Sequence, residues 1–194
     1  MNSIYDFIIR ELCPNGCFIE IYGEGGLDQI LMSIAKDAII SGTISLYIDS
    51  IGRFRPERIM QMADTSDLSV LTNLDVLSAK DSAGLVGRIY KILELNKYRL
   101  IMWDGLAYPF YEISSSHKLG LLSRMLSIYA LNGNVVVATD PLVGITGLPA
   151  GHVYTDPYVH LRAVLKRIGE RMFIEGTGFK KEYKITSRGA FLTL

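Results

Sequence analysis

Few of the side chains that bind metals or form cross-links are present in this sequence. Its 194 residues include two cysteines and three histidines. A structural zinc site needs a cluster of cysteine and histidine ligands, whereas His117, His152 and His160 are spread along the chain. The sequence therefore predicts no metal site.

An excess of charge of either sign is also missing. Lysine plus arginine and aspartate plus glutamate number 20 each, so the formal net charge is zero. Because non-specific binding to nucleic acid depends on a basic surface, this balance argues against tight DNA binding by the molecule as a whole. Any DNA site has to be local.

Long apolar runs are absent as well. The longest, such as that around residues 134–138, stop well short of the ~20 residues that a membrane-spanning helix needs. The first residues, MNSIYDFIIREL, contain early acids and no basic leader, so they do not read as a signal peptide. We therefore expect a cytoplasmic protein without membrane contact.

The two cysteines, Cys13 and Cys17, flank the turn-forming residues Pro14, Asn15 and Gly16. A tight turn could bring their thiols face to face. Since disulfides are rare in cytosolic proteins, we expect two reduced thiols, although the sequence leaves their redox state open.

What is present is the pattern of one globular α/β domain. Hydrophobic residues make up 49% of the chain and charged residues 21%, which is typical of a compact protein. Short apolar segments alternate with amphipathic ones, which predicts a mainly parallel central sheet flanked by helices. The expected strands cover residues 17–22, 44–48, 69–74, 100–103 and 134–139. The expected helices cover residues 28–41, 82–95 and 114–131, and a further helix begins at 55–58.

This alternation ends after Asp140. Residues 141–157 are rich in glycine and proline, which predicts a long loop. Strand-like runs then follow without a helix between them, at residues 158–168, 171–175, 181–185 and 190–194. We therefore expect an antiparallel C-terminal extension of the sheet after residue 157.

Ligands of doubly wound α/β proteins bind at the carboxyl ends of the strands. A glycine-rich turn at residues 23–28 and the aspartates Asp49, Asp104 and Asp140 all follow expected strands. A glycine turn between a strand and a helix can direct backbone N–H groups toward an anion, but such turns are also common for packing reasons. This edge is the expected functional site.

The residues around these features resemble the RecA/RadA recombinases and their archaeal RadA paralogues of the RadB type. The resemblance covers nearly the whole chain and implies one RecA-like core domain over residues 1–194, without the N-terminal helical DNA-binding domain of full RadA. The most specific block is YID followed by FRPERI at residues 47–59. The other matching blocks are residues 21–26, 100–104, 149–152 and 185–189.

The same resemblance implies a phosphate-binding loop, and here the sequence departs from the family. Such a loop has the pattern G-x-x-x-x-G-K-[ST], whose lysine reaches the phosphates and whose hydroxyl holds Mg²⁺. The segment from Gly23 to Gln29 is about two residues shorter than that pattern. Leu27 and Asp28 stand where lysine and threonine are expected. The resemblance therefore implies a degenerate nucleotide site, made of Gly23, Glu24, Gly25, Gly26, Asp28 and Asp104.

Two further family features are altered. The water-activating glutamate of the family falls at Ile51, which cannot act as a base, and the Asn-Gln pair that senses the γ-phosphate is replaced by Asp140 and Pro141. Asp104 matches the aspartate that orients Mg²⁺, and capping a loop is its alternative role. We expect no catalytic residue, and neither ATP nor Mg²⁺ as a cofactor.

Two segments contain candidate DNA contacts. Residues 141–157 match the second DNA-contacting loop of the recombinases, in which His152 is a candidate phosphate contact or a plain loop residue. Basic residues exceed acidic ones between Arg162 and Arg188, which could attract a DNA backbone or form only a solvated surface. The candidates there are Lys166, Arg167, Lys180 and Lys181.

The resemblance thus implies a non-catalytic accessory or mediator protein in homologous recombination and DNA repair. Its expected partner is a RadA/RecA-type recombinase, with weak DNA contact in addition. The alternatives are an atypical ATPase with a rebuilt phosphate cradle and a domain that keeps only the fold. The sequence does not define the oligomeric state.

Overall fold

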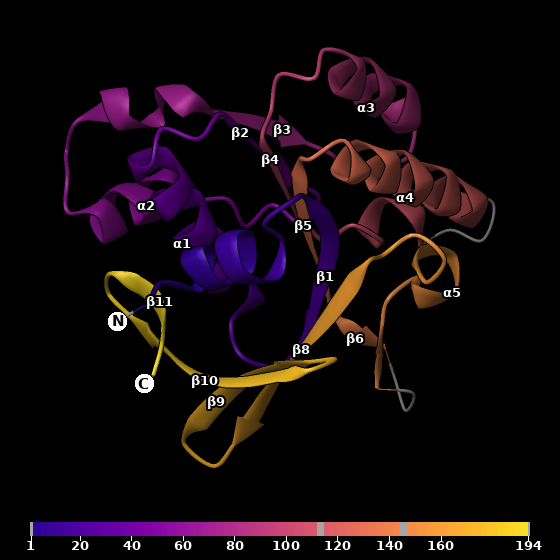
Figure 1. Ribbon diagram of the computed structural model, residues 1–194. Coiled ribbons are helices and arrows are strands. Elements are labelled where there is room, and N and C mark those ends of the chain that lie inside the picture. Colours follow the sequence, from indigo (N-terminus) through magenta and orange to yellow (C-terminus); the bar gives the residue numbers. More distant parts are fainter. Residues whose placement is uncertain (1, 112–114, 144–146, 194) are drawn as a thin grey trace.

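The computed structural model describes residues 2–111, 115–143 and 147–193. Helices and strands alternate along most of this chain (Figure 1). The α-helices are α1 (Leu27–Ile40), α2 (Pro56–Ala63), α3 (Leu85–Glu94), α4 (Ser116–Leu131) and α5 (His152–Thr155), and the other helical segments are η1 (Asp6–Leu12), η2 (Leu68–Asn73) and η3 (Tyr108–Phe110). Among the described residues, no helix combines the length and the apolar character that crossing a membrane requires.

The main sheet has the order β3-β2-β4-β5-β1-β8-β9-β10-β11. The strands from β3 to β8 are parallel and those from β8 to β11 are antiparallel, which confirms the predicted parallel sheet with an antiparallel extension. Their bounds are β1 (Cys17–Gly23), β2 (Ser45–Asp49), β3 (Leu74–Ser78), β4 (Leu100–Asp104), β5 (Val135–Asp140), β8 (Leu161–Ile168), β9 (Arg171–Gly176), β10 (Phe179–Thr186) and β11 (Gly189–Leu192).

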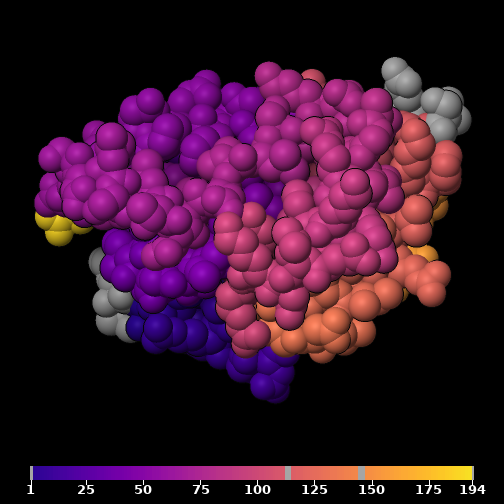
Figure 2. Space-filling model, turned by 90° about the horizontal axis from the view of Figure 1, so that it is seen from above, coloured from indigo at the N-terminus to yellow at the C-terminus, as the bar shows by residue number. Residues whose placement is uncertain are grey.

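Helices cover both faces of the parallel strands. Successive residues of a strand point to opposite faces, so the central strands contribute to two cores. Ile19, Met102 and Val137 pack with α1 and α2, and Phe18, Ile101 and Val136 pack with α3 and α4. Seen from above, the magenta segment between β2 and β4 forms much of the surface (Figure 2).

The predicted strand at residues 69–74 is wrong. Residues Leu68–Asn73 form the 3₁₀ segment η2, and the edge strand β3 begins only at Leu74. The reason is a local cap, since the Asp67 carboxylate accepts hydrogen bonds from the backbone N–H and the hydroxyl of Ser69. Such a cap favours helical geometry over extended backbone.

The segment expected as a plain loop at residues 141–157 contains regular structure. A hairpin pairs β6 (Leu142–Val143) with β7 (Leu148–Pro149), and Gly151, at φ 71°, precedes the single turn of α5. Residues 144–146 lie outside the described residues, as does Ser114, one of the expected helix caps before α4.

The expectation of two reduced thiols is also wrong. Cys13 and Cys17 form a disulfide, and their Cα atoms are 5.3 Å apart. The intervening turn brings them together, because the Gly16 N–H donates to the Cys13 carbonyl (3.1 Å) while Gly16 adopts φ 90°. The cross-link joins the end of η1 to the start of β1.

Candidate functional site

The carboxyl ends of four parallel strands gather the residues that the sequence pointed to. Asp49 ends β2, Asp104 ends β4 and Asp140 ends β5, and Asp49 and Asp104 are direct neighbours in the sheet. The glycine turn lies at the same edge, after β1.

The turn between β1 and α1 is tied to β8. Glu24 donates its backbone N–H to the Leu165 carbonyl (3.0 Å). A Cβ atom on Gly23 would lie 2.3 Å from that carbonyl oxygen, so only glycine permits this approach. Gly26, at φ 83°, then leads directly into α1.

Two residues of β10 also contact this turn. The Tyr183 hydroxyl donates to the Gly25 carbonyl (2.8 Å), and burial raises the pKa of Tyr183 to about 12. Ile185 packs against Gly26, where a Cβ would lie 2.8 Å from its Cδ1 atom. The Glu24 N–H and the Gly25 carbonyl are therefore engaged by protein, and the turn is packed closely at Gly23 and Gly26.

Asp49 caps the loop that follows β2. Its Oδ1 accepts the backbone N–H groups of Ile51 (3.1 Å), Gly52 (2.6 Å) and Arg53 (3.2 Å), and its Oδ2 accepts that of Phe54 (3.1 Å). This carboxylate is fully used in shaping the loop. The loop-capping role considered for Asp104 thus belongs to Asp49.

Asp104 is fully buried and paired with Arg53. Arg53 donates from Nε to Oδ2 (3.1 Å) and from Nη2 to Oδ1 (2.5 Å), and Thr139 donates its hydroxyl to Oδ1 (3.0 Å). The hydrogen bonds to Asp104 raise the pKa of Arg53. A two-pronged arginine–carboxylate pair of this kind is among the stronger charged contacts in proteins.

A second acidic pair lies beside it. Glu20 and Asp140 are 0% and 1% exposed. Burial raises the pKa of Asp140 well above its usual range, and the negative charge of Glu20 adds to the shift. Arg162 donates from Nε to Glu20 (2.6 Å) and from Nη2 to the Thr155 hydroxyl (2.8 Å), and it also contacts Asp156.

Arg53, Glu20 and Arg162 are site residues that the sequence reasoning missed. Glu20 could have been found from the sequence, because it is a charged residue inside the apolar run of β1. Arg53 lies between YID at residues 47–49 and FRPERI at residues 54–59. An arginine in the loop after a strand that ends in aspartate was the pattern that could have indicated it.

The predicted DNA contacts fall on different faces of the antiparallel strands. Lys166 and Lys180 both approach Glu175, at 3.0 and 3.8 Å. Strand alternation places Arg167 and Lys181 on the opposite face, because Lys181 pairs with the buried Ile174. His152 lies at the start of α5, with its Nδ1 atom 3.3 Å from the Pro149 carbonyl oxygen.

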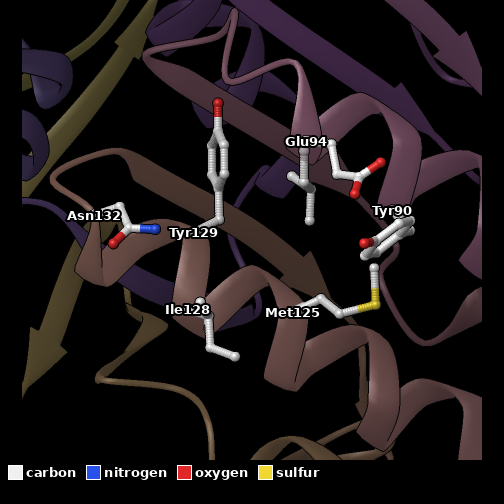
Figure 3. A pocket seen from close by; sticks show the side chains of 7 residues that line it. Tyr90, Glu94, Met125, Ile128, Tyr129 and Asn132 are labelled. Carbon is white, nitrogen blue, oxygen red and sulfur yellow. The ribbon is translucent and has the colours of Figure 1, made fainter.

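One pocket adjoins this edge of the sheet, and another lies away from it. One of about 360 Å³ adjoins the start of α1 and is lined by Asp28, Gln29, Met32, Arg53, Arg55 and Arg58. The other, of about 230 Å³, lies between α3 and α4 and is mainly apolar (Figure 3). Its lining includes Tyr129, whose hydroxyl donates to the Tyr98 carbonyl, and none of the acidic groups of the carboxyl edge.

Two proteins of known pathway are similar to parts of this chain, although no family model matches it. The DNA repair and recombination protein RadB of Pyrococcus furiosus is 24% identical over 119 residues, which cover 58% of this chain and 52% of that protein. The protein of the same description from Methanosphaera stadtmanae is 31% identical over 81 residues, covering 41% and 35%. The matches thus span about half or less of these relatives.

A solved structure supports the fold. The crystal structure of the RadB recombinase matches with a TM-score of 0.70 and 16% identity, over 91% of this chain and 90% of that one. The likeness therefore covers most of the chain and shows a RecA-like core.

Proposed function

We propose that this chain, which is similar to two RadB proteins and has a RecA-like core, acts in DNA repair and recombination as a non-catalytic accessory protein. The two RadB relatives support the pathway. The geometry of the carboxyl edge supports the absence of catalysis. In this proposal residues 1–194 act as one RecA-like core domain.

The observation that carries the proposal is the closed turn between β1 and α1. A phosphate loop surrounds its ligand with free backbone N–H groups and a lysine. Here only Glu24, Gly25 and Gly26 separate the strand from the helix. The Glu24 N–H is used by β8 and the Gly25 carbonyl by Tyr183. Glu24 and Asp28 add negative charge where a triphosphate would lie.

The residues at this edge also do not fit Mg²⁺. Asp104 is engaged by Arg53 and Thr139, and Ile51 has no group that can take a proton from water. Among the residues that the structure describes, no group of three or more carboxylates, histidines or cysteines could hold a metal ion.

Calorimetry with MgATP tests the absence of a nucleotide site. We expect no heat of binding at millimolar nucleotide, and no phosphate release above that of a mock preparation. An active RecA-type ATPase serves as the positive control. A micromolar Kd, or phosphate release that Asp104→Ala abolishes, contradicts the proposal.

The partner is proposed to be a RecA-type recombinase, bound through surfaces of the core. Recombinases pack head to tail, so a paralogue with one matching face can bind a subunit without extending the polymer. Co-purification and a strand-exchange assay with and without the protein test this role. If the two proteins neither associate nor change each other's activity at low and moderate salt, the accessory role is wrong.

Direct DNA binding is proposed to be weak and to involve Lys166 and Lys180, with Arg167, Lys181 and His152 as further candidates. Glu175 neutralises part of the charge of the first two lysines. We expect Lys166→Gln with Lys180→Gln to lower the salt dependence of binding by about one unit of slope for each phosphate that is no longer neutralised. Lys97→Gln, which alters a lysine paired with Asp75, is the matched control.

A rebuilt anion site is the second candidate function, and the pocket beside α1 favours it. Arg53, Arg55 and Arg58 line that pocket together with Asp28. Under this alternative, MgATP binds and Arg55→Ala with Arg58→Ala weakens it. Under the main proposal, both forms of the protein show no binding.

A further inference from the structure

Acidic side chains crowd the carboxyl edge of the sheet. Asp104 and Asp140 are buried there, and the charges of Glu20 and Asp104 both act on Asp140. Charges buried together destabilise a fold unless cations or hydrogen bonds compensate them. In this structure the compensation comes from two arginines, since Arg162 pairs with Glu20 and Arg53 pairs with Asp104.

We propose that Arg53 is a resident counter-cation, which occupies the face of Asp104 that a divalent metal ion would otherwise take and makes this edge independent of any bound metal. The guanidinium uses both carboxylate oxygens of Asp104. Thr139 adds a third hydrogen bond. A hydrated metal ion would have to displace a two-pronged contact and overcome the positive charge of Arg53.

The backbone holds Arg53 in this position. Asp49 binds the N–H groups of Gly52, Arg53 and Phe54, so the loop is fixed on both sides of the arginine. The Arg53 side chain is 38% exposed while the Asp104 side chain is 0% exposed, so the guanidinium lies between the solvent and the buried acid. Arg53 therefore covers the Asp104 carboxylate on its solvent side.

The substitution Arg53→Gln separates this role from a merely structural one. It keeps a hydrogen-bonding side chain and removes the charge, so Asp104 is left without its cation. We expect the variant to be less stable than wild type in a metal-free buffer. We also expect Mg²⁺ or Mn²⁺ to restore its melting temperature, because a ligand that binds only the folded state stabilises it.

The measurements are thermal unfolding with and without MgCl₂, and Mn²⁺ titration followed by electron paramagnetic resonance. We expect Arg53→Gln to bind Mn²⁺ at least about tenfold more tightly than wild type, with weak affinity overall because few ligands are available. The double variant Arg53→Gln with Asp104→Asn is expected to lose this gain. Arg10→Gln is the matched control, because Arg10 also pairs with a carboxylate, that of Asp6, but on the surface and away from this edge.

Two results overturn the proposal. One is a Mn²⁺ site in the wild-type protein that Asp104→Asn removes, since Asp104 would then be open to metal despite Arg53. The other is a destabilised Arg53→Gln variant that no divalent cation restores. If Arg53→Gln does not fold, the Mn²⁺ titrations of the wild-type protein and of Asp104→Asn test the proposal by themselves. The experiment contains no nucleotide, DNA or recombinase, so its outcome is separate from that of the proposed function.

Discussion

Asp140 has a carboxyl group almost cut off from water, next to the buried Glu20. Its Oδ1 accepts the Ala107 N–H (2.9 Å), and its Oδ2 accepts no hydrogen bond from a described residue. The hydrogen bond between Asp140 and Glu20 requires a proton on Asp140, which adds to the rise of its pKa. Burial and the Glu20 charge raise its pKa, so the folded protein holds the proton more firmly than the unfolded chain. This contribution to stability is full below the usual aspartate pKa and is lost as the pH rises through the folded value.

Asp140→Asn should therefore stabilise the protein at neutral and higher pH. The amide keeps an acceptor for the Ala107 N–H and carries no charge. We expect a gain in the free energy of unfolding at pH 8, which disappears toward pH 4 as the wild-type carboxyl group takes up its proton. Urea unfolding across this pH range measures it. Asp81→Asn, at an exposed aspartate that accepts the Ala83 N–H, is the control. Equal pH slopes for Asp140→Asn and wild type would contradict the prediction.

His160 should make the protein sensitive to acid. Its Nδ1 accepts the Phe18 N–H (3.0 Å) and its Nε2 lies 2.9 Å from the Ser127 hydroxyl, which is the pattern of a neutral ring. Burial lowers its pKa, so the unfolded chain takes up a proton first as the pH falls. Stability should decrease below about pH 6.5.

His160→Gln should lower stability at pH 8 and flatten the acid slope. Thermal unfolding between pH 8 and pH 5 measures both effects. His117→Gln, at a position in α4 away from that contact, is the matched control. An unchanged slope in His160→Gln would show that other groups cause the acid sensitivity.

The aspartates of the site were predictable and their partners were not. Asp49, Asp104 and Asp140 each follow an apolar strand, and parallel strands bring such residues to one edge. The pairing of Arg53 with Asp104 depends on how the loop after β2 folds. That conformation results from four hydrogen bonds between Asp49 and the backbone N–H groups of residues 51–54. An aspartate that caps a following turn is a local pattern, but it does not indicate which carboxylate the Arg53 side chain reaches.

At the scale of elements, the disulfide between η1 and β1 should stabilise the fold. A cross-link restricts the unfolded chain, and for so short a loop the gain is about 2 kcal/mol. The double variant Cys13→Ser, Cys17→Ser is expected to lose that amount in denaturant unfolding. Wild-type protein treated with a reductant should match the variant. A reductant effect that persists in the variant would exclude the disulfide as its cause.

Tyr183 should couple β10 to the turn before α1. Tyr183→Phe removes the hydroxyl that binds the Gly25 carbonyl, which is expected to cost about 1 kcal/mol. It should also speed hydrogen exchange at residues 24–27. Tyr129→Phe, which removes a hydrogen bond to the Tyr98 carbonyl, is the control for hydroxyl loss elsewhere. Faster exchange in both variants alike would refute a specific coupling.

Most elements were predictable because their patterns are local. The buried strands β4 and β5 are nearly continuous apolar runs, and α1 has apolar residues at helical spacing. The error at residues 69–74 has a physical cause, since these residues are apolar enough for a strand while Asp67 caps a helical turn before them. The N-terminal η1 went unassigned, and its buried Phe7 packs edge-on against Phe179 of β10, a contact between opposite ends of the sequence.

For the whole molecule, the antiparallel strands should be indispensable. β8 forms one of the two neighbours of β1, and β10 contributes Tyr183 to the core. A chain that stops after Asp140 should not fold cooperatively, because β1 would expose an unpaired edge and an open core. Circular dichroism during thermal unfolding measures this, and a sharp transition in the shortened chain would contradict it.

The position of β1 also sets an order of events during synthesis. β1 lies in the middle of the sheet, and its partners β5 and β8 begin only at Val135 and Leu161. Pairing over such distances along the chain is slow. Both edges of β1 therefore stay unpaired until β5 and β8 have been translated, a period in which an unpaired strand can associate with the wrong neighbour. We expect β1 to need protection from such pairing until these two strands are available.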